Sequence, residues 1–534
     1  MHLASLMLPM LLAAQPPSGT LAPPLINQES QSSAPDLNTE PTPPPRPSPD
    51  AIVRVDADTV DVPIRGISFV GVDAPKRVAN AAAAFVGKPA SRETLSALAK
   101  VISDAYAKSG IALYTVAIPQ QDLSGGDVKV LLAEGFVEDI AYPQGASPLV
   151  RAYAERLKRE RPLSRRSLER HLSLMRDIPG AKMDVALVRG TAPGGVKLSV
   201  TPQRKRTDFS FGIDNRSQRG LGTGQIKASA QGYSLLRDGD RTDLVLLSAI
   251  DMKRYRYAGL SHQTPIGSDG LTLALSTSVL RTRLKGLPIT GDAETAGISI
   301  SYPVIRGYKQ NLTASVGFDA LNSDAAYLGS VLSSDHIRAL RTALGYSLVG
   351  EKSVLTASLS GARGLDIWGA RGPLGFTDVV FTKVTGRAGY DRMIGKKLVG
   401  RLRVMGQYSG DRLSGNERLA IGGFEFGRAF DTAVISGDKG MAGSLELALR
   451  PTLPEKMKGS EIYGFIDGAR VTVNARGPYA QATYDLASAG GGVRLSYTRR
   501  ASLSLEGARV IDRPYPAAGG GWRFNISWQL NLKK

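Results

Sequence analysis

The stretch "FNISWQLNL", residues 524–532, alternates apolar and polar side chains without interruption. Successive side chains of a β-strand point to opposite sides, so each set occupies its own face. The apolar positions are Phe524, Ile526, Trp528, Leu530 and Leu532, and the polar ones are Asn525, Ser527, Gln529 and Asn531. A strand with one apolar face and one face of small polar groups is typical of a wall between lipid and water.

The same alternation returns in many segments after residue 206. It is present in "LTLALSTSV" (271–279), "LTASVGF" (312–318) and "VLTASLS" (354–360). A soluble β-sandwich would alternate similarly, but these polar faces carry Ser, Thr, Gly and Asn where a dry core needs Val and Ile. The length of 206–534 suits roughly sixteen strands of about ten residues with their loops. We therefore predict a transmembrane antiparallel β-barrel over 206–534, with a water-filled lumen unless something occupies it.

The N-terminal residues indicate export. An apolar run from Leu3 to Leu12 is followed by Ala13 and Ala14, which is the form of a signal peptide over residues 1–14, although its first residues lack Lys and Arg. Residues 15–59 are rich in Pro, Ser and Gln and cannot bury enough apolar surface to fold, so they are predicted to be a linker. No later segment approaches the roughly 18 consecutive apolar residues of a membrane helix. An exported chain of this kind crosses a membrane only as a closed barrel.

Two small α+β modules are predicted between the linker and the barrel. Over residues 60–141 the order is strand, helix, helix, strand, strand, which describes a three-stranded sheet on one face of a helix pair. Residues 142–205 repeat this plan loosely, with one helix ahead of two strands. An exposed edge of the first sheet could accept an added strand from another polypeptide.

The second module is strongly basic. Residues 151–206 hold 15 Lys and Arg against five Asp and Glu, in a chain whose net charge is +19. Such charge indicates a solvated face, or a surface that attracts anionic lipid head groups or an acidic client chain. Nucleic acid is not an expected partner, because the export signal directs the chain away from it.

Neither an enzyme nor a cofactor or metal site is predicted. The chain has no cysteine and four histidines, and it contains neither a HExxH motif nor a Gly-x-Ser-x-Gly turn. The segment "GYDRMIGKK" (389–397) has one residue too many between its glycines, and lacks the Ser or Thr, for a phosphate-binding loop.

Several of these segments resemble the TpsB family of two-partner secretion transporters, the haemolysin secretion/activation proteins of the outer membrane. "IPQQDLSGGDVKVLLAEG" (118–135) is similar to the family's Pro-x-Gln, Gly and terminal Glu-Gly pattern in a POTRA domain. "PLSRRSLERHLSLMRDIPG" (162–180) is similar to the helix and Pro-Gly turn of its second POTRA domain. The resemblance covers nearly everything after the linker, and it implies two POTRA domains ahead of the barrel.

The sharpest match is "IGGFEFGRAFDTAVISGDKG" (421–440). The family has Ile-Gly-Gly, then Val-Arg-Gly-aromatic, then Gly-Asp-x-Gly, in a long extracellular loop that folds into the lumen. The corresponding positions are Ile421, Gly422 and Gly423, then Gly427, Arg428 and Phe430 with Asp431 after them, then Gly437, Asp438 and Gly440. Ala429 replaces a glycine and cannot take positive φ as cheaply, so the tip is expected to differ in shape.

The resemblance also implies a partner for Arg428. "YGFIDGARV" (463–471) is similar to the family's strand motif, which places Asp467 on the inner barrel wall facing the loop. A guanidinium in a partly dehydrated lumen needs a carboxylate, so a bidentate pair between Arg428 and Asp467 is expected. The alternative is a solvated loop cation and a solvated acid, which stabilise the fold by about 0 to 1 kcal/mol together.

The function that the resemblance implies is export of an unfolded exoprotein, which is bound by the POTRA domains in the periplasm and passed through the lumen. The alternative is a factor that inserts other barrel proteins into the outer membrane, which depends on more POTRA modules. A diffusion porin would need none. We expect a monomer surrounded by outer-membrane lipid. Two features depart from the family: residues 15–59 contain no clear plug helix, and the chain ends in Leu532-Lys533-Lys534 where the family has an aromatic residue.

Overall fold

The computed structural model describes residues 53–55, 62–498 and 500–533. The predicted signal peptide, residues 1–14, lies outside the described residues, and so does the predicted linker apart from 53–55. The question of a plug helix falls on the same part of the chain. No helix in the described ranges is long and apolar enough to span a membrane.

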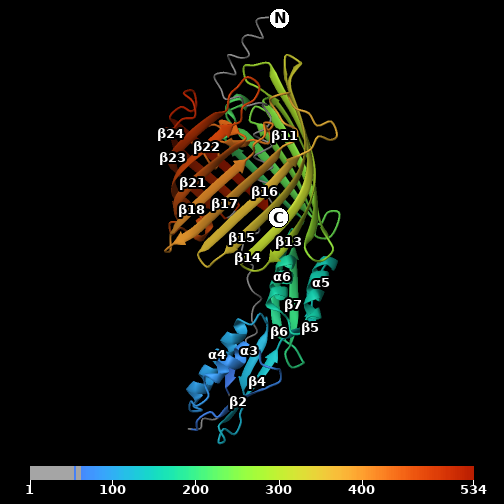
Figure 1. Ribbon diagram of the computed structural model, residues 1–534, viewed down its shortest axis with the longest axis vertical. Coiled ribbons are helices and arrows are strands. Elements are labelled where there is room, and N and C mark those ends of the chain that lie inside the picture. Colours follow the sequence, from blue (N-terminus) through green and yellow to red (C-terminus); the bar gives the residue numbers. More distant parts are fainter. Residues whose placement is uncertain (1–52, 56–61, 499, 534) are drawn as a thin grey trace.

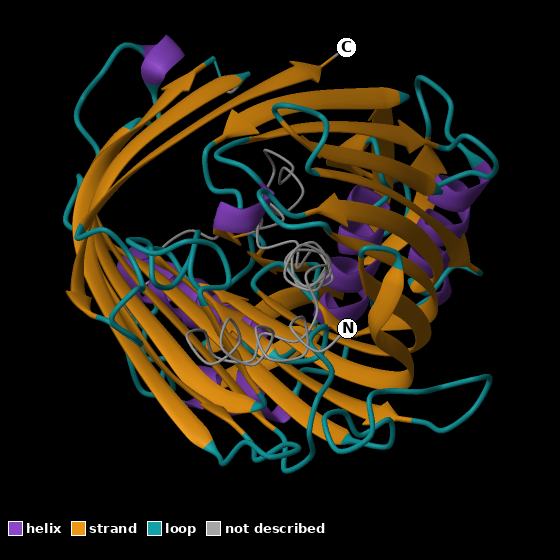
Figure 2. Cartoon of the chain, turned by 90° about the horizontal axis from the view of Figure 1, so that it is seen from above, coloured by secondary structure: helices purple, strands orange, loops and turns teal. Residues whose placement is uncertain are grey.

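A closed barrel of sixteen strands forms the C-terminal part of the chain, which confirms the predicted fold (Figures 1 and 2). Each strand pairs antiparallel with its neighbours, and the last strand pairs with the first from Ser527 opposite Asp214 to Lys533 opposite Asp208. In chain order the strands are β8 (Thr207–Asp214), β9 (Gln225–Tyr233), β10 (Arg241–Ala249), β11 (Tyr255–Ile266), β12 (Leu271–Arg283), β13 (Ile289–Arg306), β14 (Gln310–Tyr327), β15 (Ser330–Val349), β16 (Ser353–Gly364), β17 (Thr382–Ile394), β18 (Leu398–Tyr408), β21 (Lys439–Leu449), β22 (Glu461–Val473), β23 (Ala482–Tyr497), β24 (Ala501–Asp512) and β25 (Trp522–Lys533).

The two faces of each strand divide as the alternation predicts. Leu275 on β12 and Ile298 on β13 lie side by side in the register and are exposed on the outer face. The alternate positions, such as Ser299, face the lumen. Barrel closure by this register leaves no unpaired sheet edge in the wall, which is the condition for a sheet in a bilayer.

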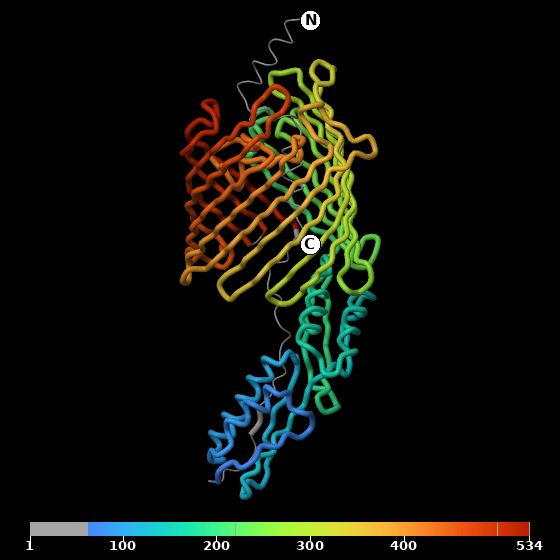
Figure 3. The backbone as a smooth tube through the Cα atoms, viewed as in Figure 1, coloured from blue at the N-terminus to red at the C-terminus, as the bar shows by residue number. Residues whose placement is uncertain are grey.

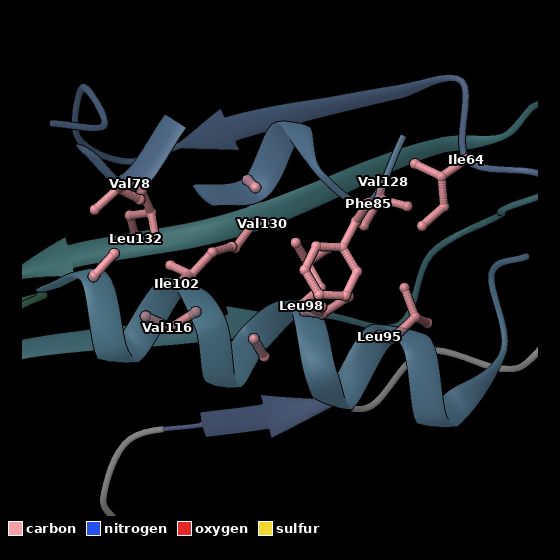
Figure 4. Close-up of a cluster of buried hydrophobic side chains, with 14 of the residues drawn as sticks. Ile64, Val78, Phe85, Leu95, Leu98, Ile102, Val116, Val128, Val130 and Leu132 are labelled. Carbon is pink, nitrogen blue, oxygen red and sulfur yellow. The ribbon is translucent and has the colours of Figure 1, made fainter. Parts of the chain in front are cut away.

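Module 1 precedes the barrel and packs two helices against a sheet (Figures 1 and 4). Its elements are β2 (Gly66–Val70), α3 (Lys76–Ala83), α4 (Arg92–Ala107), β3 (Tyr114–Ile118) and β4 (Asp127–Glu134). Ser91 caps the start of helix α4, because its hydroxyl accepts a hydrogen bond from the Thr94 backbone N–H at 3.2 Å. Leu95, Leu98 and Ile102 repeat at helical spacing and are buried against the sheet, which gives the module its own core.

The sheet of module 1 differs from the prediction at both ends. It has four strands in the order β1-β3-β4-β2, because β1 (Val53–Val55) pairs parallel with β3. Residues 53–55 were predicted to be linker, and their "VRV" is a β-favouring run that the proline content around it concealed. At the other end, β5 (Phe136–Ala141) pairs parallel with a strand of the next module, so residues 136–141 do not belong to module 1.

Module 2 has a three-stranded sheet in the order β5-β7-β6 with helices on one face. After β5 come α5 (Pro148–Glu155), the 3-10 turn η1 (Arg156–Arg159), α6 (Arg165–Arg176), β6 (Ala181–Arg189) and β7 (Gly195–Arg204). The plan therefore contains an additional strand and helix compared with the predicted helix and two strands. Leu168, Leu172 and Met175 line the buried face of α6.

Module 2 is docked on the turns at one end of the barrel, which we call the module end (Figure 3). The Asp177 carboxylate accepts two hydrogen bonds of 2.6 Å from Arg306 at the end of β13. Arg170 reaches Asp269 in the β11–β12 turn, at 3.2 Å, and the Pro303 carbonyl, at 2.8 Å. Part of the module's basic charge therefore faces the barrel, where the prediction considered only solvent, lipid and client.

The opposite end of the barrel, the far end, carries an apolar cluster inside the wall. Lumen-facing side chains from β10 to β16 pack there with side chains from three connecting loops. The members of this far-end cluster are Leu221, Leu247, Ala249, Tyr255, Leu280, Ala293, Leu321, Ile337, Ala339, Ala362, Phe381 and Leu413. Burial of these apolar side chains stabilises the packing of the three loops against the wall at the far end.

Candidate functional site in the barrel lumen

A long loop between β18 and β21, residues 409–438, folds back into the barrel; we call it the lumen loop. Its arms are β19 (Leu419–Ile421) and β20 (Ile435–Gly437), which pair antiparallel. Phe426 and Phe430 at its tip, residues 422–434, pack in a buried cluster with Tyr463 and Phe465 of the wall. The aromatic groups of the motif therefore anchor the tip against the barrel interior.

Arg428 at the tip is buried, with 7% of its surface exposed. Its Nη1 donates to Glu446 Oε2 at 2.9 Å and to Glu506 Oε2 at 3.3 Å, and the guanidinium lies 4.1 Å from the centre of the Phe465 ring. Charge-assisted hydrogen bonds and a ring face are what a dehydrated guanidinium requires. Two glutamates of the wall therefore compensate the cation.

Asp467 on β22 holds the backbone of the tip. Its Oδ1 accepts hydrogen bonds from the Gly427 backbone N–H at 2.8 Å and from Ser488 Oγ at 2.6 Å, and its Oδ2 accepts the Arg428 backbone N–H at 3.4 Å. The Arg428 Nε is 3.8 Å from Oδ2, beyond hydrogen-bond distance. The expected bidentate pair is therefore wrong in detail, because the backbone N–H groups take the carboxylate and the guanidinium extends past it.

The two glutamates belong to a larger charged network on the inner wall. Glu446 also accepts hydrogen bonds from Arg401 at 2.7 Å and from both terminal nitrogens of Arg494, at 2.7 and 2.8 Å. Glu506 also accepts from Arg216 Nη2 and from Tyr463 Oη, both at 2.8 Å. Arg428 thus bonds to both glutamates of this network.

Asp438, from the third part of the motif, is completely buried where the loop rejoins the wall. Its carboxylate accepts the Leu413 and Asn474 backbone N–H groups, at 2.8 and 2.7 Å, and Arg476 Nη2 at 2.5 Å. This carboxylate fastens the start of the lumen loop to the connection after β22. Gly437 and Gly440 flank it at the junction of β20 and β21.

Further ion pairs hold the sides of the loop. Asp431 pairs with Arg523 of β25. Glu417 accepts hydrogen bonds from Arg341 of β15 and Lys383 of β17. The loop therefore bonds to the wall on several strands, and its position depends on more than the tip.

Two glycines of the motif are required by the backbone. Gly427 has φ of 69° and Gly422 has φ of 119°, both in the region that favours glycine. A Cβ on Gly422 would lie 2.3 Å from the Asp431 carbonyl oxygen, too close for any other residue. Ala429 is not among the positive-φ residues, so the turn at the tip is made by Gly427 and the alanine costs no strain.

A metal site is not formed: among the described residues no three His, Asp or Glu side chains converge in a way that could hold an ion. The carboxylates of the lumen are instead saturated by arginines and backbone N–H groups. The arrangement can hold a loop in place by charge.

A comparison with known families decides the assignment. The family model for haemolysin secretion/activation proteins, ShlB/FhaC/HecB, matches residues 194–495, and a ShlB-type POTRA domain matches 62–135. This chain belongs to the ShlB/FhaC/HecB family. Its barrel is that of an outer-membrane transporter family, with the POTRA domains in the periplasm, so the module end is periplasmic and the far end is extracellular.

Individual members of the ShlB/FhaC/HecB group are distant in sequence. The heme/hemopexin transporter protein HuxB of Haemophilus influenzae strain 86-028NP is 23% identical over 375 residues, which cover 67% of this chain and 66% of HuxB, just under two thirds. The hemolysin transporter protein HpmB of Proteus mirabilis is 24% identical, covering 84% of this chain and 82% of HpmB. The solved structure of CdiB from Escherichia coli has a TM-score of 0.75 at 18% identity, covering 96% of this chain and 99% of CdiB, and shows the same fold.

The family motifs in the sequence indicated Arg428 and Asp467 as partners, but they did not indicate Glu446 and Glu506. Both glutamates occupy lumen-facing positions of strands β21 and β24, in "SLELAL" and "SLSLEG", among small or polar neighbours. A charged side chain on the small-residue face of an alternating strand was the available signal. It could not show which charges meet, because the register and the loop bring them together.

Proposed function

We propose that this chain exports an unfolded exoprotein of the haemolysin or filamentous haemagglutinin type from the periplasm to the cell surface by two-partner secretion. The observation that carries the proposal is the lumen loop that holds Arg428 inside a closed barrel, in a chain of the ShlB/FhaC/HecB family with two α+β modules, the first of which matches a POTRA domain. A loop of this kind narrows the lumen. The chain acts as a transporter with no catalytic reaction.

The proposed export is passive. The segment 389–397, whose glycine spacing approaches that of a phosphate-binding loop, lies at the end of β17 and in the turn before β18, so no helix follows it to receive a phosphate. The direction of transport then comes from folding of the exoprotein outside the cell, because the folded exoprotein cannot pass back through the barrel.

Client recognition is proposed at module 1. Strand β2 is the edge of its sheet and pairs on one side with β4, from Gly66 opposite Asp127 to Val70 opposite Leu131. The other side of β2 offers backbone N–H and C=O groups to an extended client. Such pairing uses the backbone of the client, so it depends on the client being extended more than on the client's sequence. This property suits an exporter of unfolded protein.

The barrel is proposed to work as a monomer in lipid. Each chain closes its own sixteen-stranded wall, and apolar side chains such as Leu275, Ile298 and Leu344 are exposed on the outer face. These groups match the lipid tails, so no second copy is needed to cover them.

The test is export of a co-expressed haemagglutinin-like exoprotein fragment by cells with and without this chain, with the amounts of other outer-membrane barrels measured in parallel. We expect exoprotein outside the cells only when the chain is present. Arg428→Ala should reduce export, and the matched control Arg470→Ala, which removes an exposed arginine paired with Asp485, should not. Absence of export together with loss of other barrels would identify the alternative, a barrel insertion factor.

A further inference from the structure

The inner wall of the barrel is divided into a charged part and an uncharged part. Lumen-facing positions of β17 to β24 carry Lys383, Arg401, Glu446, Asp467 and other charged residues that hold the lumen loop. Lumen-facing positions of β11, β12 and β13, within the fully described stretch 255–303, carry no charged side chain. We call this second part the uncharged wall.

The register defines which side chains form the uncharged wall. Glu417 of the lumen loop bonds to Arg341, which places Arg341 inside, and Arg341 lies opposite Gly317, Gly317 opposite Ser299, and Ser299 opposite Ala274. Alternation then assigns the remaining positions. The polar members that the argument uses are Ser261, Gln263, Ser276, Thr295, Ser299 and Ser301.

The outer neighbours confirm this division of faces. Leu275 and Ile298 alternate with the members of the uncharged wall and are exposed on the lipid side. Charged residues of the same strands, such as Arg281 and Asp292, pair with each other on the outer face near the extracellular end. The lack of charge is therefore specific to the lumen side of these strands.

The chemistry of the uncharged wall suits a moving polypeptide. Hydroxyl and amide groups exchange hydrogen bonds with a passing backbone and with water at little net free energy. Charged groups would bind client charges of opposite sign and repel those of like sign. The backbone groups of these strands are already paired in the barrel, so they offer no strand to add to.

We propose that the uncharged wall is the track along which the exported polypeptide crosses the barrel, as an extended and unfolded chain of either charge. This inference rests on the proposed export function and names the part of the lumen that serves it. The charged wall positions the loop, and the uncharged wall contacts the client.

The absence of cysteine from the chain makes a direct test possible. Ser276→Cys and Ser299→Cys place one thiol on the uncharged wall, Ser504→Cys places one on the lumen face of β24, and Thr277→Cys places one on the outer face of β12. Each full-length variant is labelled with a thiol-reactive photo-crosslinker in cells. An exoprotein fragment fused to a disulfide-bonded domain is then arrested during export and illuminated.

The yield of crosslinks to the arrested fragment is expected to be about tenfold higher at positions 276 and 299 than at positions 504 and 277. This ratio corresponds to a tenfold preference of the fragment for the uncharged wall. Equal or stronger crosslinking at 504 would overturn the proposal. If the cysteine-free parent does not export the fragment, the proposed function fails instead, and the two failures are thereby distinguished.

A charge variant supplies a second measurement. The double variant Ser276→Lys with Ser299→Lys is expected to slow export of an acidic fragment about fivefold, through transient ion pairs. Ser504→Lys is the matched control and should leave the rate unchanged. Heat-resistant migration on gels shows whether each variant has a folded barrel, and equal rates in folded variants would contradict the track.

Discussion

Arg428 is held by an unequal set of partners. It is one of three arginines on Glu446, with Arg401 and Arg494, and it shares Glu506 with Arg216. Loss of one arginine leaves each glutamate compensated by others. Loss of Glu446 leaves several cations without their common carboxylate, which is the costlier state for buried charge.

This inequality predicts that Glu446→Ala destabilises the barrel more than Arg428→Ala does. We expect a cost of about 3 to 5 kcal/mol for Glu446→Ala and a smaller one for Arg428→Ala. Denaturant unfolding of the purified protein in detergent, followed by tryptophan fluorescence and gel mobility, measures both. Equal losses, or a larger loss for Arg428→Ala, would show that the network is not shared in this way.

The contacts of Asp467 lead to a separate prediction. Asp467→Asn keeps an oxygen that can accept the Gly427 N–H, whereas Asp467→Ala leaves two buried N–H groups without an acceptor. The alanine variant should lose about 1 to 3 kcal/mol and loosen the tip, and the asparagine variant should lose less. Proteolysis of the tip, residues 422–434, compares them. An asparagine variant as sensitive as alanine would return the main role to charge pairing with Arg428.

Among elements, α6 shows what the sequence could and could not predict. Leu168, Leu172 and Met175 repeat at helical spacing, so the helix and its buried face followed from the pattern. The docking of its other side on the barrel did not, because Arg170 and Asp269 are far apart in the sequence and each resembles an ordinary surface charge. Strand β1 and the assignment of β5 were likewise decided by pairing partners that local sequence does not reveal.

His171 on α6 predicts a pH dependence of module 2. Burial, with Arg156 and Arg170 nearby, lowers its pKa from the ordinary 6.5 to about 4. Between these values the unfolded module binds more protons than the folded one, so stability rises with pH. Lowering the pH from 6.5 to 4 should destabilise module 2 by up to about 3 kcal/mol.

Hydrogen–deuterium exchange of Arg165–Arg176 in the full-length protein at several pH values, corrected for the intrinsic rate, checks this. His171→Gln should remove the extra pH dependence, and the control His262→Gln, on a barrel strand, should retain it. A wild-type helix whose protection does not change across the window would contradict the lowered pKa.

For the whole molecule, the alternating strands and the length of 206–534 predicted a barrel of about sixteen strands, and the structure confirms it. The packing of loops at the far end could not be predicted in the same way. The far-end cluster joins strands to Leu221, Phe381 and Leu413 in three loops, and these residues become neighbours only after the barrel closes. The ends of the lumen therefore differ: module 2 docks at the periplasmic end and an apolar cluster lies at the extracellular end.

Phe381→Ala should loosen the far-end cluster at the extracellular end. The side chain is completely buried in the far-end cluster, and its truncation costs about 3 to 5 kcal/mol of packing. We expect larger and more frequent conductance in planar bilayers and greater sensitivity of cells to large antibiotics. Phe209→Ala, on the outer face of β8, is the matched control and should behave as the parent. Unchanged conductance of the Phe381 variant would show that the far-end cluster does not restrict the lumen.

The fixed lumen loop also restricts what can pass through the barrel. The ion pairs of Arg428, Asp431 and Glu417 join the loop to several strands of the wall, so the loop cannot move aside without breaking them. Under the proposed export, an extended polypeptide needs less of the cross-section than a folded domain of the same mass. An exoprotein that folded too early would then be retained in the periplasm.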